Sequence, residues 1–177
     1  MYLPLTWNML HKLSTELARN VKKDGYAFDV IVAIARGGMP IATIMADALN
    51  LRNVATFTVS TYEQMHKKKE AQLVLGCGDQ ITGKRVLLVD DISDSGESLA
   101  FGIDYLNKMG VTSLKTATVF AKPGTSSLPD FYVQQTTEWV IFPYEVEETR
   151  EICHNIMTED REKGMQLDEA IQDLELQ

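Results

Sequence analysis

The sequence predicts an α/β fold with a mostly parallel central sheet flanked by helices. Residues 28–35 and 86–89 are rich in Val, Ile, Leu and Ala, as is typical of strands that are buried on both faces. Each run is followed by a turn that contains glycine and then by apolar residues at helical spacing. Repeated strand–turn–helix units favour a parallel sheet, because the helix carries the chain back to begin the next strand.

The composition is that of an ordinary globular protein, and it narrows the classes of partner. The chain has 177 residues, of which 45% are hydrophobic and 24% charged, enough for one domain with a substantial core. A formal net charge of −8 argues against nucleic acids and anionic membranes as partners, because phosphate contacts need clustered Lys and Arg. We expect residues 1–157 to form the main domain and residues 158–177 to be an acidic helix or tail of the same domain.

We expect a cytoplasmic protein, because the sequence shows no targeting signal and its cysteines suit a reducing compartment. No signal peptide precedes the first helix, and no apolar run reaches membrane-spanning length. Cys77 and Cys153 show no metal-ligand spacing, so we expect both to be reduced thiols.

Capping residues and apolar runs define the elements at the start of the chain. Thr6 suits the N-cap of a helix that runs to about Lys23, with an apolar stripe that is typical of core packing. After the strand at 28–35, Pro40 suits the first position of a helix over 41–49.

The remaining elements continue the alternation of strands and helices. Strands are expected at 54–60, from about Gln72, and at 114–121. Helices are expected at 146–157 and 159–174, and the second of them is strongly acidic.

Residues 86–98 form the motif around which the rest of the chain is organised. An apolar strand over 86–89 is followed directly by Asp90 and Asp91, and a loop of small hydroxyl residues and glycine then leads into a helix that Gly110 ends. The loop residues that we single out are Ser93, Asp94, Ser95, Gly96, Glu97 and Ser98. Strand, acidic pair, loop and helix N-terminus together predict a site for a phosphorylated sugar.

The chemistry of these groups supports that prediction. N–H groups at a helix start lack partners within the helix and carry the positive end of its dipole, so they bind phosphate. Gly96 lets the backbone approach a ligand closely, and the serine hydroxyls add donors without bulk. Asp90 and Asp91 suit another task, which is to accept hydrogen bonds from sugar hydroxyls or to hold a hard cation such as Mg²⁺.

At these residues the chain resembles the type I phosphoribosyltransferases, whose fingerprint is an apolar run, two acidic residues and a Ser/Thr/Gly-rich loop. The resemblance implies the fold of that family and binding of 5-phosphoribosyl-1-pyrophosphate (PRPP) with Mg²⁺. Ser95 and Ser98 stand where the family usually has threonine, and Glu97 is compatible with a phosphate site only if its side chain points away. The alternative is an α/β protein in which the same motif is purely structural.

Residues Arg36, Gly37 and Gly38 form a second turn, after the strand at 28–35. On its own, Ala-Arg-Gly-Gly is typical of a tight turn with a solvated arginine. Beside the PRPP motif it resembles the pyrophosphate loop of the family, in which the guanidinium binds phosphate oxygens. The resemblance implies a non-proline cis peptide bond at Ala35–Arg36 or at Arg36–Gly37.

The polar segment 61–69 lies where the family has a flexible hood loop that closes over the reacting atoms and excludes water. Ser60, Thr61 and Tyr62 resemble the entrance of that hood. The lysines at 67–69 either attract an anionic substrate or are simply solvated, and the sequence leaves both interpretations open.

Four further residues resemble the base pocket of the 6-oxopurine branch of the family. The resemblance implies that Asp94 bonds purine N7 and acts as the general base, and that Lys122 contacts O6. It also implies that Trp139 stacks on the base and that Val140 reads the exocyclic group with its backbone. A surface position for Lys122 and a core position for Trp139 are the structural alternatives. Glu145 resembles an acidic residue that holds a second Mg²⁺ through water.

Together these resemblances imply an enzyme that transfers the phosphoribosyl group of PRPP to N9 of guanine, hypoxanthine or xanthine in purine salvage. They also imply a homodimer or homotetramer. Two alternatives stay open, a PRPP-binding regulator with the same fold and little catalysis, and a phosphosugar- or nucleotide-binding protein with another reaction. The acidic balance argues against RNA binding, and the lack of a P-loop or a GxGxxG motif does not support the usual nucleotide folds.

Overall fold

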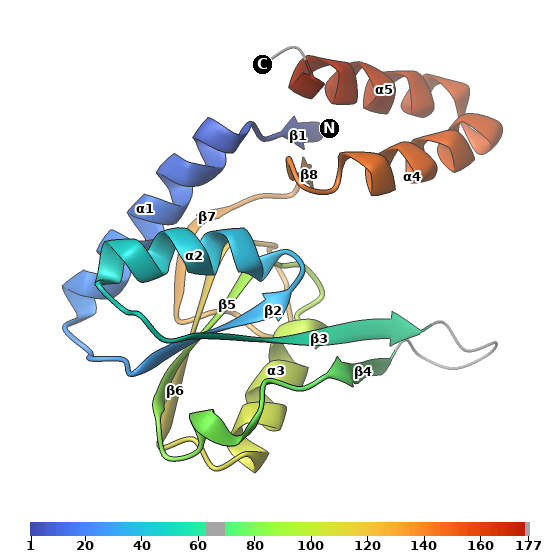
Figure 1. Cartoon of the computed structure of the whole chain (residues 1–177). Coiled ribbons are helices and arrows are strands. Elements are labelled where there is room, and N and C mark those ends of the chain that lie inside the picture. Colours follow the sequence, from blue (N-terminus) through green and yellow to red (C-terminus); the bar gives the residue numbers. More distant parts are fainter. Residues whose placement is uncertain (63–69, 176–177) are drawn as a thin grey trace. The chain divides into compact units, whose positions relative to one another are not determined.

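The structure is a computed structural model that describes residues 1–62 and 70–175 (Figure 1). The chain divides into two compact units, a larger one of Leu13–Thr136 and a smaller one of Met1–Lys12 with Thr137–Gln177. Helix α1 (Trp7–Asp24) begins in the smaller unit and ends in the larger one. In the described ranges, no helix combines the length and the apolar character that crossing a membrane requires.

The larger unit is built on a six-stranded sheet. Its strands are β2 (Val30–Ala35), β3 (Val54–Tyr62), β4 (Glu70–Leu75), β5 (Arg85–Ser93), β6 (Ser113–Ala121) and β7 (Phe131–Gln135). The strand order is β4-β3-β2-β5-β6-β7, and every neighbouring pair is parallel except β3 with β4. This topology confirms the expected α/β fold with a mostly parallel sheet. A short 3₁₀ turn, Asp79–Ile81, connects β4 to β5.

Two helices cover opposite faces of this sheet, α2 (Gly38–Leu49) and α3 (Glu97–Lys108) (Figure 1). The alternation of side chains along a strand explains how both faces become apolar. Leu88 packs with Leu99 and Leu106 of α3, whereas its neighbours Leu87 and Val89 point to the opposite face, where α2 contacts β5. All five side chains are buried, so the central strand needs apolar residues at every position.

The parallel register brings the predicted site residues together at the carboxyl ends of the strands. β5 continues to Ser93, although the sequence predicted that its strand ends before Asp90. The reason is the ladder with β6, in which Asp90 pairs with Thr118 and Ser93 with Ala121. The acidic pair is therefore held on extended backbone at the edge where open α/β sheets bind their ligands.

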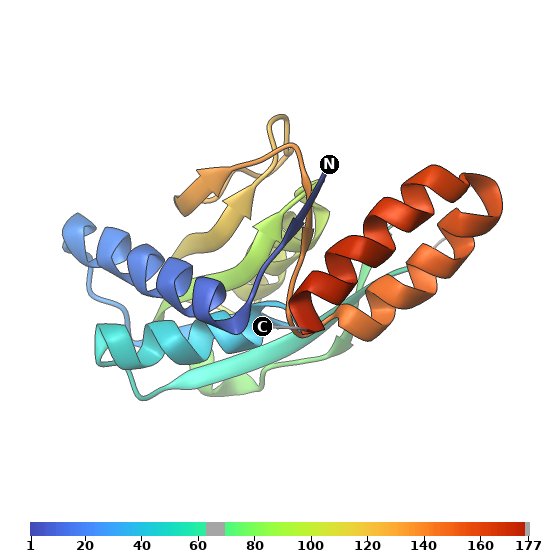
Figure 2. The same cartoon turned by 90° about the horizontal axis from the view of Figure 1, so that it is seen from above.

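The smaller unit contains a pair of short strands and a helical hairpin. β1 (Tyr2–Pro4) and β8 (Trp139–Ile141) pair in parallel. α4 (Val146–Glu159) and α5 (Arg161–Glu175) lie side by side (Figure 2), close to the bounds expected from the sequence. The apolar core of this unit is formed by Ile141, Cys153, Leu167 and Ile171.

Several further elements differ from the expectation. α2 begins at Gly38, so Pro40 lies within its first turn, where the missing N–H leaves no helical bond unmade. β1, β7 and β8 were not expected as strands. β1 and β8 are three residues each and pair with each other across nearly the whole chain, which local patterns do not reveal. β7 is a five-residue strand that pairs with β6, the element before it.

Candidate active site

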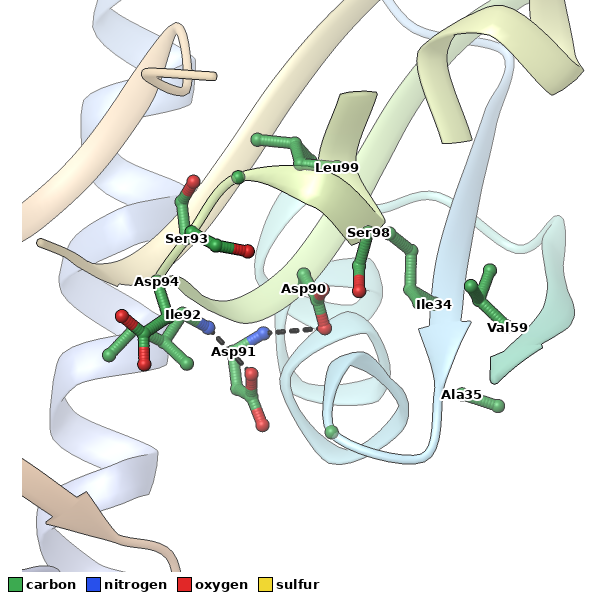
Figure 3. Close-up of a pocket in the computed structure, with 13 residues that line it drawn as sticks. Ile34, Ala35, Val59, Asp90, Asp91, Ile92, Ser93, Asp94, Ser98 and Leu99 are labelled. Atoms are coloured by element: carbon green, nitrogen blue, oxygen red, sulfur yellow. Dashed lines mark hydrogen bonds between the residues drawn. The ribbon is translucent and has the colours of Figure 1, made fainter. Parts of the chain in front are cut away.

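A cavity of about 270 Å³ opens at the carboxyl ends of the central strands (Figure 3). Ile34, Val59 and Leu99 give it some apolar surface, and Ala35 and Ile92 complete the wall. The lining residues that the sequence predicted are Gly37, Asp90, Asp91, Ser93, Asp94, Ser95, Gly96 and Ser98. The cavity therefore contains most of the predicted PRPP motif.

The two carboxylates at the end of β5 differ in their surroundings. The Asp91 N–H donates to Asp90 Oδ1 (3.0 Å), and the Ile92 N–H donates to Asp91 Oδ1 (2.6 Å) (Figure 3). Asp90 is only 7% exposed. Burial, and then the charge of Asp91, raise the pKa of Asp90 well above its ordinary value. A ligand that brings hydroxyl donors or positive charge offsets both effects, so the site favours such ligands.

The turn after β2 lies directly against the end of β5. A Cβ at Gly37 would overlap the carboxylate of Asp91, and a Cβ at Gly38 would overlap the carbonyl oxygen of Val89. The peptide bond Ala35–Arg36 is cis, which confirms the expected cis bond in this loop. Arg36 is exposed, and its carbonyl oxygen accepts a hydrogen bond from an N–H in the first turn of α2 (3.1 Å). The turn at 36–38 is thus in contact with the end of β5, at the wall of the cavity.

The turn from β5 into α3 presents the start of the helix to the cavity. Gly96 has a φ of 88°, in the left-handed region that favours glycine, and α3 begins directly after it. The Glu97 N–H donates to Ser95 Oγ (3.3 Å). Ser98 and Leu99 line the cavity, whereas Glu97 is exposed and does not. The negative side chain therefore lies away from the cavity, as compatibility with a phosphate requires.

A loop that the sequence analysis did not single out holds this turn in place. The Ser93 hydroxyl donates to the carbonyl oxygen of Ser127 (2.7 Å) and bonds Thr125 Oγ1 (2.8 Å). The N–H and the hydroxyl of Ser126 both donate to the carbonyl oxygen of Ser95 (3.0 and 2.7 Å). The sequence predicted Ser93 as a donor to phosphate, but its buried hydroxyl is engaged with this loop. In the sequence, the Ser/Thr cluster that follows Pro123 and Gly124 indicates a turn, but it does not indicate which residues the turn contacts.

The four predicted base-binding residues fall into both units. Asp94 is exposed and lines the cavity. Lys122 is half-buried after β6, and its backbone N–H donates to the carbonyl oxygen of Ser93 (2.9 Å). Trp139, 41% exposed, and Val140, 5% exposed, lie on β8 in the smaller unit. The larger unit thus brings Lys122 next to the turn that carries Asp94.

The predicted hood entrance lies on a strand, as expected for Ser60 but not for Thr61 and Tyr62. Ser60, Thr61 and Tyr62 continue β3, where their backbone pairs with residues 70–72 of β4. This pairing was not expected, because the polar sequence from residue 61 onward favours a loop. The lysines at 67–69 lie outside the described residues.

The predicted metal-binding residues form no complete metal cage. Glu145 accepts a hydrogen bond from the Phe142 N–H through Oε1 (3.1 Å), so its carboxylate closes a turn in the smaller unit. In the part of the chain that the structure describes, no group of three or more His, Cys, Asp or Glu residues is arranged to hold a metal ion. Asp90 and Asp91 nevertheless fit Mg²⁺, which proteins usually hold through one or two carboxylates while substrate phosphates and waters complete its shell.

Comparisons with known proteins agree with this geometry. Residues 6–149 match the family described as the phosphoribosyl transferase domain. A xanthine-guanine phosphoribosyltransferase of Desulfotalea psychrophila is 36% identical over 148 residues, which cover 81% of this chain and 86% of that protein. Another of Idiomarina loihiensis is 30% identical over 80% of this chain and 86% of that protein. The crystal structure of a purine phosphoribosyltransferase from Pyrococcus horikoshii matches with a TM-score of 0.73 and 31% identity, over 81% of this chain and 93% of that one.

Proposed function

The chain belongs to the phosphoribosyltransferase family, and on this premise we propose that it transfers the 5-phosphoribosyl group of PRPP to N9 of a 6-oxopurine. In this reaction a bond forms between N9 and C1′ of the ribose, and the bond between C1′ and the pyrophosphate oxygen breaks. The purine gives up one proton, and pyrophosphate leaves. The choice of a purine base is supported by relatives that are named as xanthine-guanine and purine phosphoribosyltransferases.

One observation carries the proposal, namely that a single cavity contains both the acidic end of β5 and the N-terminus of α3. We assign the 5-phosphate to the turn, where N–H groups of the first helical turn lack helical partners and attract an anion. Ser95 and Ser98 add hydroxyl groups, and Gly96 keeps the wall free of a side chain. Ser93 takes part by holding the turn rather than by bonding the phosphate.

We assign the ribose to Asp90 and Asp91. The two carboxylates accept hydrogen bonds from ribose hydroxyls, which compensates the burial of Asp90. Their negative charge also stabilises positive charge as it develops at C1′ in the transition state. Placing the sugar between these carboxylates and the phosphate turn leaves C1′ as the one carbon open to attack, which is catalysis by positioning.

We assign the pyrophosphate to the turn at Arg36, Gly37 and Gly38. The guanidinium of Arg36 binds phosphate oxygens in a bidentate manner, and the start of α2 adds N–H donors. Mg²⁺ would be held by Asp90 and Asp91 together with the substrate, and when bound it neutralises charge on the leaving pyrophosphate. Glu145 stays a prediction as a second, water-mediated metal contact, since its carboxylate also closes its own turn.

We assign the base to Asp94, Lys122, Trp139 and Val140. Asp94 takes the role of general base or of acceptor at N7, because it is exposed at the cavity rim beside the ribose carboxylates. Lys122 is assigned to O6, Trp139 to stacking on the purine, and Val140 to the exocyclic group. These assignments explain a preference for 6-oxopurines, whose O6 accepts a hydrogen bond from an ammonium group, over adenine.

Several expectations accompany the proposed reaction and remain predictions. They are a homodimer or homotetramer, a cytoplasmic location, and a hood loop entered through Ser60, Thr61 and Tyr62. We also predict that residues 1–157 form the main domain and that residues 158–177 are an acidic helix or tail of the same domain.

The proposal is tested by incubating the protein with PRPP, Mg²⁺ and one base at a time, namely guanine, hypoxanthine, xanthine or adenine. We expect a nucleoside 5′-monophosphate from at least one 6-oxopurine, and none from adenine. Calorimetric titration with PRPP in Mg²⁺ serves as the parallel measurement. Binding of PRPP without any nucleotide formation would identify a non-catalytic PRPP-binding protein, and absence of both would refute the proposed site.

A further inference from the structure

In the smaller unit the ring of Tyr2 packs against the ring of Trp139. The ring centroids lie 6.1 Å apart and the planes are tilted by 54°. At this separation tilted aromatic rings attract each other beyond the area that they bury. Tyr2 is half-buried, while Trp139 is 41% exposed. One side of the indole therefore has a protein contact, and a large part of its surface remains open to a ligand.

Backbone pairing fixes the positions from which the two rings extend. Tyr2 is the register partner of Trp139 in the parallel pair of β1 and β8. The Trp139 N–H donates to the carbonyl oxygen of Met1 (3.1 Å), and the Leu5 N–H donates to the carbonyl oxygen of Ile141 (2.9 Å). Both ends of the short strand β8 are thus bonded to the first five residues of the chain.

The helical hairpin supports Tyr2 in turn. Tyr2 packs on the buried cluster of Ile141, Cys153, Leu167 and Ile171, to which α4 and α5 both contribute. α5 contacts β1 directly. The acidic C-terminal helix therefore fixes the N-terminal strand, and through Tyr2 it limits how the indole of Trp139 can rotate.

We propose that Tyr2 is a positioning residue for the base-stacking ring of Trp139, so that β1 and α5 form part of the base site. This inference rests on the proposed function, which assigns the purine to Trp139. A stacking ring that is held in one orientation loses less conformational freedom when the base binds than a ring that rotates. Loss of Tyr2 therefore weakens binding of the base while the chemistry at C1′ and the binding of PRPP stay unchanged.

The kinetic test compares three variants, Tyr2→Phe, Tyr2→Leu and Tyr2→Ala. Phenylalanine keeps the ring, whereas leucine keeps apolar bulk on the buried cluster but removes the ring. For Tyr2→Leu and Tyr2→Ala we expect the KM for the purine to rise about three- to tenfold, the range that aromatic pairs contribute. The kcat and the KM for PRPP stay within twofold, and Tyr2→Phe has the kinetics of the unsubstituted chain.

A fluorescence titration gives a second measurement that needs no turnover. The chain has two tryptophans, and Trp7→Phe leaves Trp139 as the only one. Trp7 is 57% exposed beside Tyr144, and phenylalanine keeps an aromatic ring there. In this background we expect guanosine 5′-monophosphate to quench Trp139 at a lower concentration when Tyr2 is retained, or is replaced as Tyr2→Phe, than in Tyr2→Leu.

The outcomes separate this inference from the proposed function. An unchanged purine KM in Tyr2→Leu and Tyr2→Ala would overturn the role of Tyr2, even in a chain that forms nucleotide normally. A parallel loss of kcat and of PRPP binding would also overturn it, because it indicates general loss of structure. Failure of the proposed function appears instead as absence of nucleotide with the unsubstituted chain. The titration then still tests whether Tyr2 positions Trp139 for ligand binding. If guanosine 5′-monophosphate does not quench Trp139, the proposed role of Tyr2 is rejected.

Discussion

At the scale of the residue, close contacts decide which amino acids the site accepts. Gly37 has φ −60° and ψ −40°, a helical conformation that any amino acid adopts readily. The nearest obstacle to a side chain there is the carboxylate of Asp91. At Gly38 the obstacle is the carbonyl oxygen of Val89, which is backbone and cannot rotate away. Glycine at position 37 therefore leaves room for the carboxylate of Asp91 in the proposed ribose site. Glycine at position 38 allows α2 to pack closely on β5.

Replacing Gly37 tests this distinction. In Gly37→Ala the added methyl group displaces the carboxylate of Asp91, so we expect PRPP affinity to fall about tenfold or more, since a misplaced charged hydrogen bond costs roughly 1.5–3 kcal/mol. Isothermal titration calorimetry with PRPP and Mg²⁺ measures the change. Met39→Ala is the matched control, because that side chain is 45% exposed in the first turn of the same helix. Unchanged PRPP affinity in Gly37→Ala would show that the carboxylate of Asp91 is not needed at its present position.

Replacing Asp94 tests the proposed proton acceptor. Asp94→Asn keeps the size of the side chain but removes its basicity, so we expect kcat to fall by a factor of about 10²–10⁴. Affinity for PRPP should change less than twofold, because Asp94 is assigned to the base and not to the sugar. Steady-state kinetics and calorimetry measure the two effects. The control is Asp104→Asn, an exposed residue paired with Lys108 at the far end of α3. Normal kcat in Asp94→Asn would remove Asp94 from the mechanism.

At the scale of the element, the phosphate turn depends on a loop that follows the neighbouring strand. β5 and β6 run side by side to the same edge of the sheet, so the segments that follow them meet there. Hydrogen bonds from Ser93 and Ser126 join these segments, and a Cβ at Gly96 would overlap the loop at Thr125–Ser127. The turn is therefore shaped before any ligand binds, which reduces the conformational entropy that binding would otherwise cost.

Thr125→Val tests this support. Valine has nearly the same shape as threonine but cannot form the hydrogen bond with Ser93 Oγ, which is 2.8 Å long. Loss of this bond costs about 1 kcal/mol and leaves the turn less ordered, so we expect PRPP affinity to fall roughly three- to tenfold. The matched control is Thr112→Val, which removes a hydroxyl bond to the carbonyl oxygen of Gly83 at the opposite edge of the sheet. We expect both variants to unfold at similar temperatures in differential scanning calorimetry. Equal PRPP affinities in the two variants would contradict a role for the loop.

At the scale of the whole molecule, stability and the proposed chemistry involve opposite edges of the central sheet. At the amino ends of β2 and β5, Asp29 accepts hydrogen bonds from the Arg85 N–H (2.8 Å), Nε (3.0 Å) and Nη2 (2.7 Å). These bonds hold the pKa of Asp29 well below its ordinary value. At the carboxyl ends, Asp90 has the opposite shift, because burial raises its pKa. At the amino ends, the ionised form of Asp29 stabilises the folded state. At the carboxyl ends, ionisation of the buried Asp90 destabilises it.

The pH dependence of unfolding tests the contribution of Asp29. A carboxyl group with a lowered folded-state pKa stabilises the protein above its unfolded-state pKa of about 4, and this stabilisation is lost as the pH falls further. We expect Asp29→Asn to lower Tm at pH 7. The difference from the unsubstituted chain should shrink steadily below pH 4, where Asp29 begins to bind protons in the unfolded state. A difference in Tm that is the same at pH 3 and pH 7 would contradict this assignment.

Local patterns predicted much of this structure. The central strands, α2, α3 and the final hairpin were expected because apolar runs and helical spacing are properties of neighbouring residues. The acidic pair with its Ser/Gly turn was also expected, since strand, turn and helix N-terminus follow one another directly in the chain. The continuation of β5 through Asp90, the short strand β1 and the bonded hydroxyl of Ser93 were not. Each of these depends on a partner from a distant part of the chain.

The sequence by itself determined the α/β class, the order of the central elements and the identity of the groups that suit a phosphorylated sugar, and its resemblance to a family implied PRPP. Propensity, hydrophobic spacing and the chemistry of side chains act over a few residues, so they can be read along the chain. Only the tertiary structure decided that Gly37 contacts Asp91, that Thr125 hydrogen-bonds Ser93, and that Tyr2 packs on Trp139. These contacts arise from the order and register of the strands, which are set by the packing of the whole core and not by any single segment.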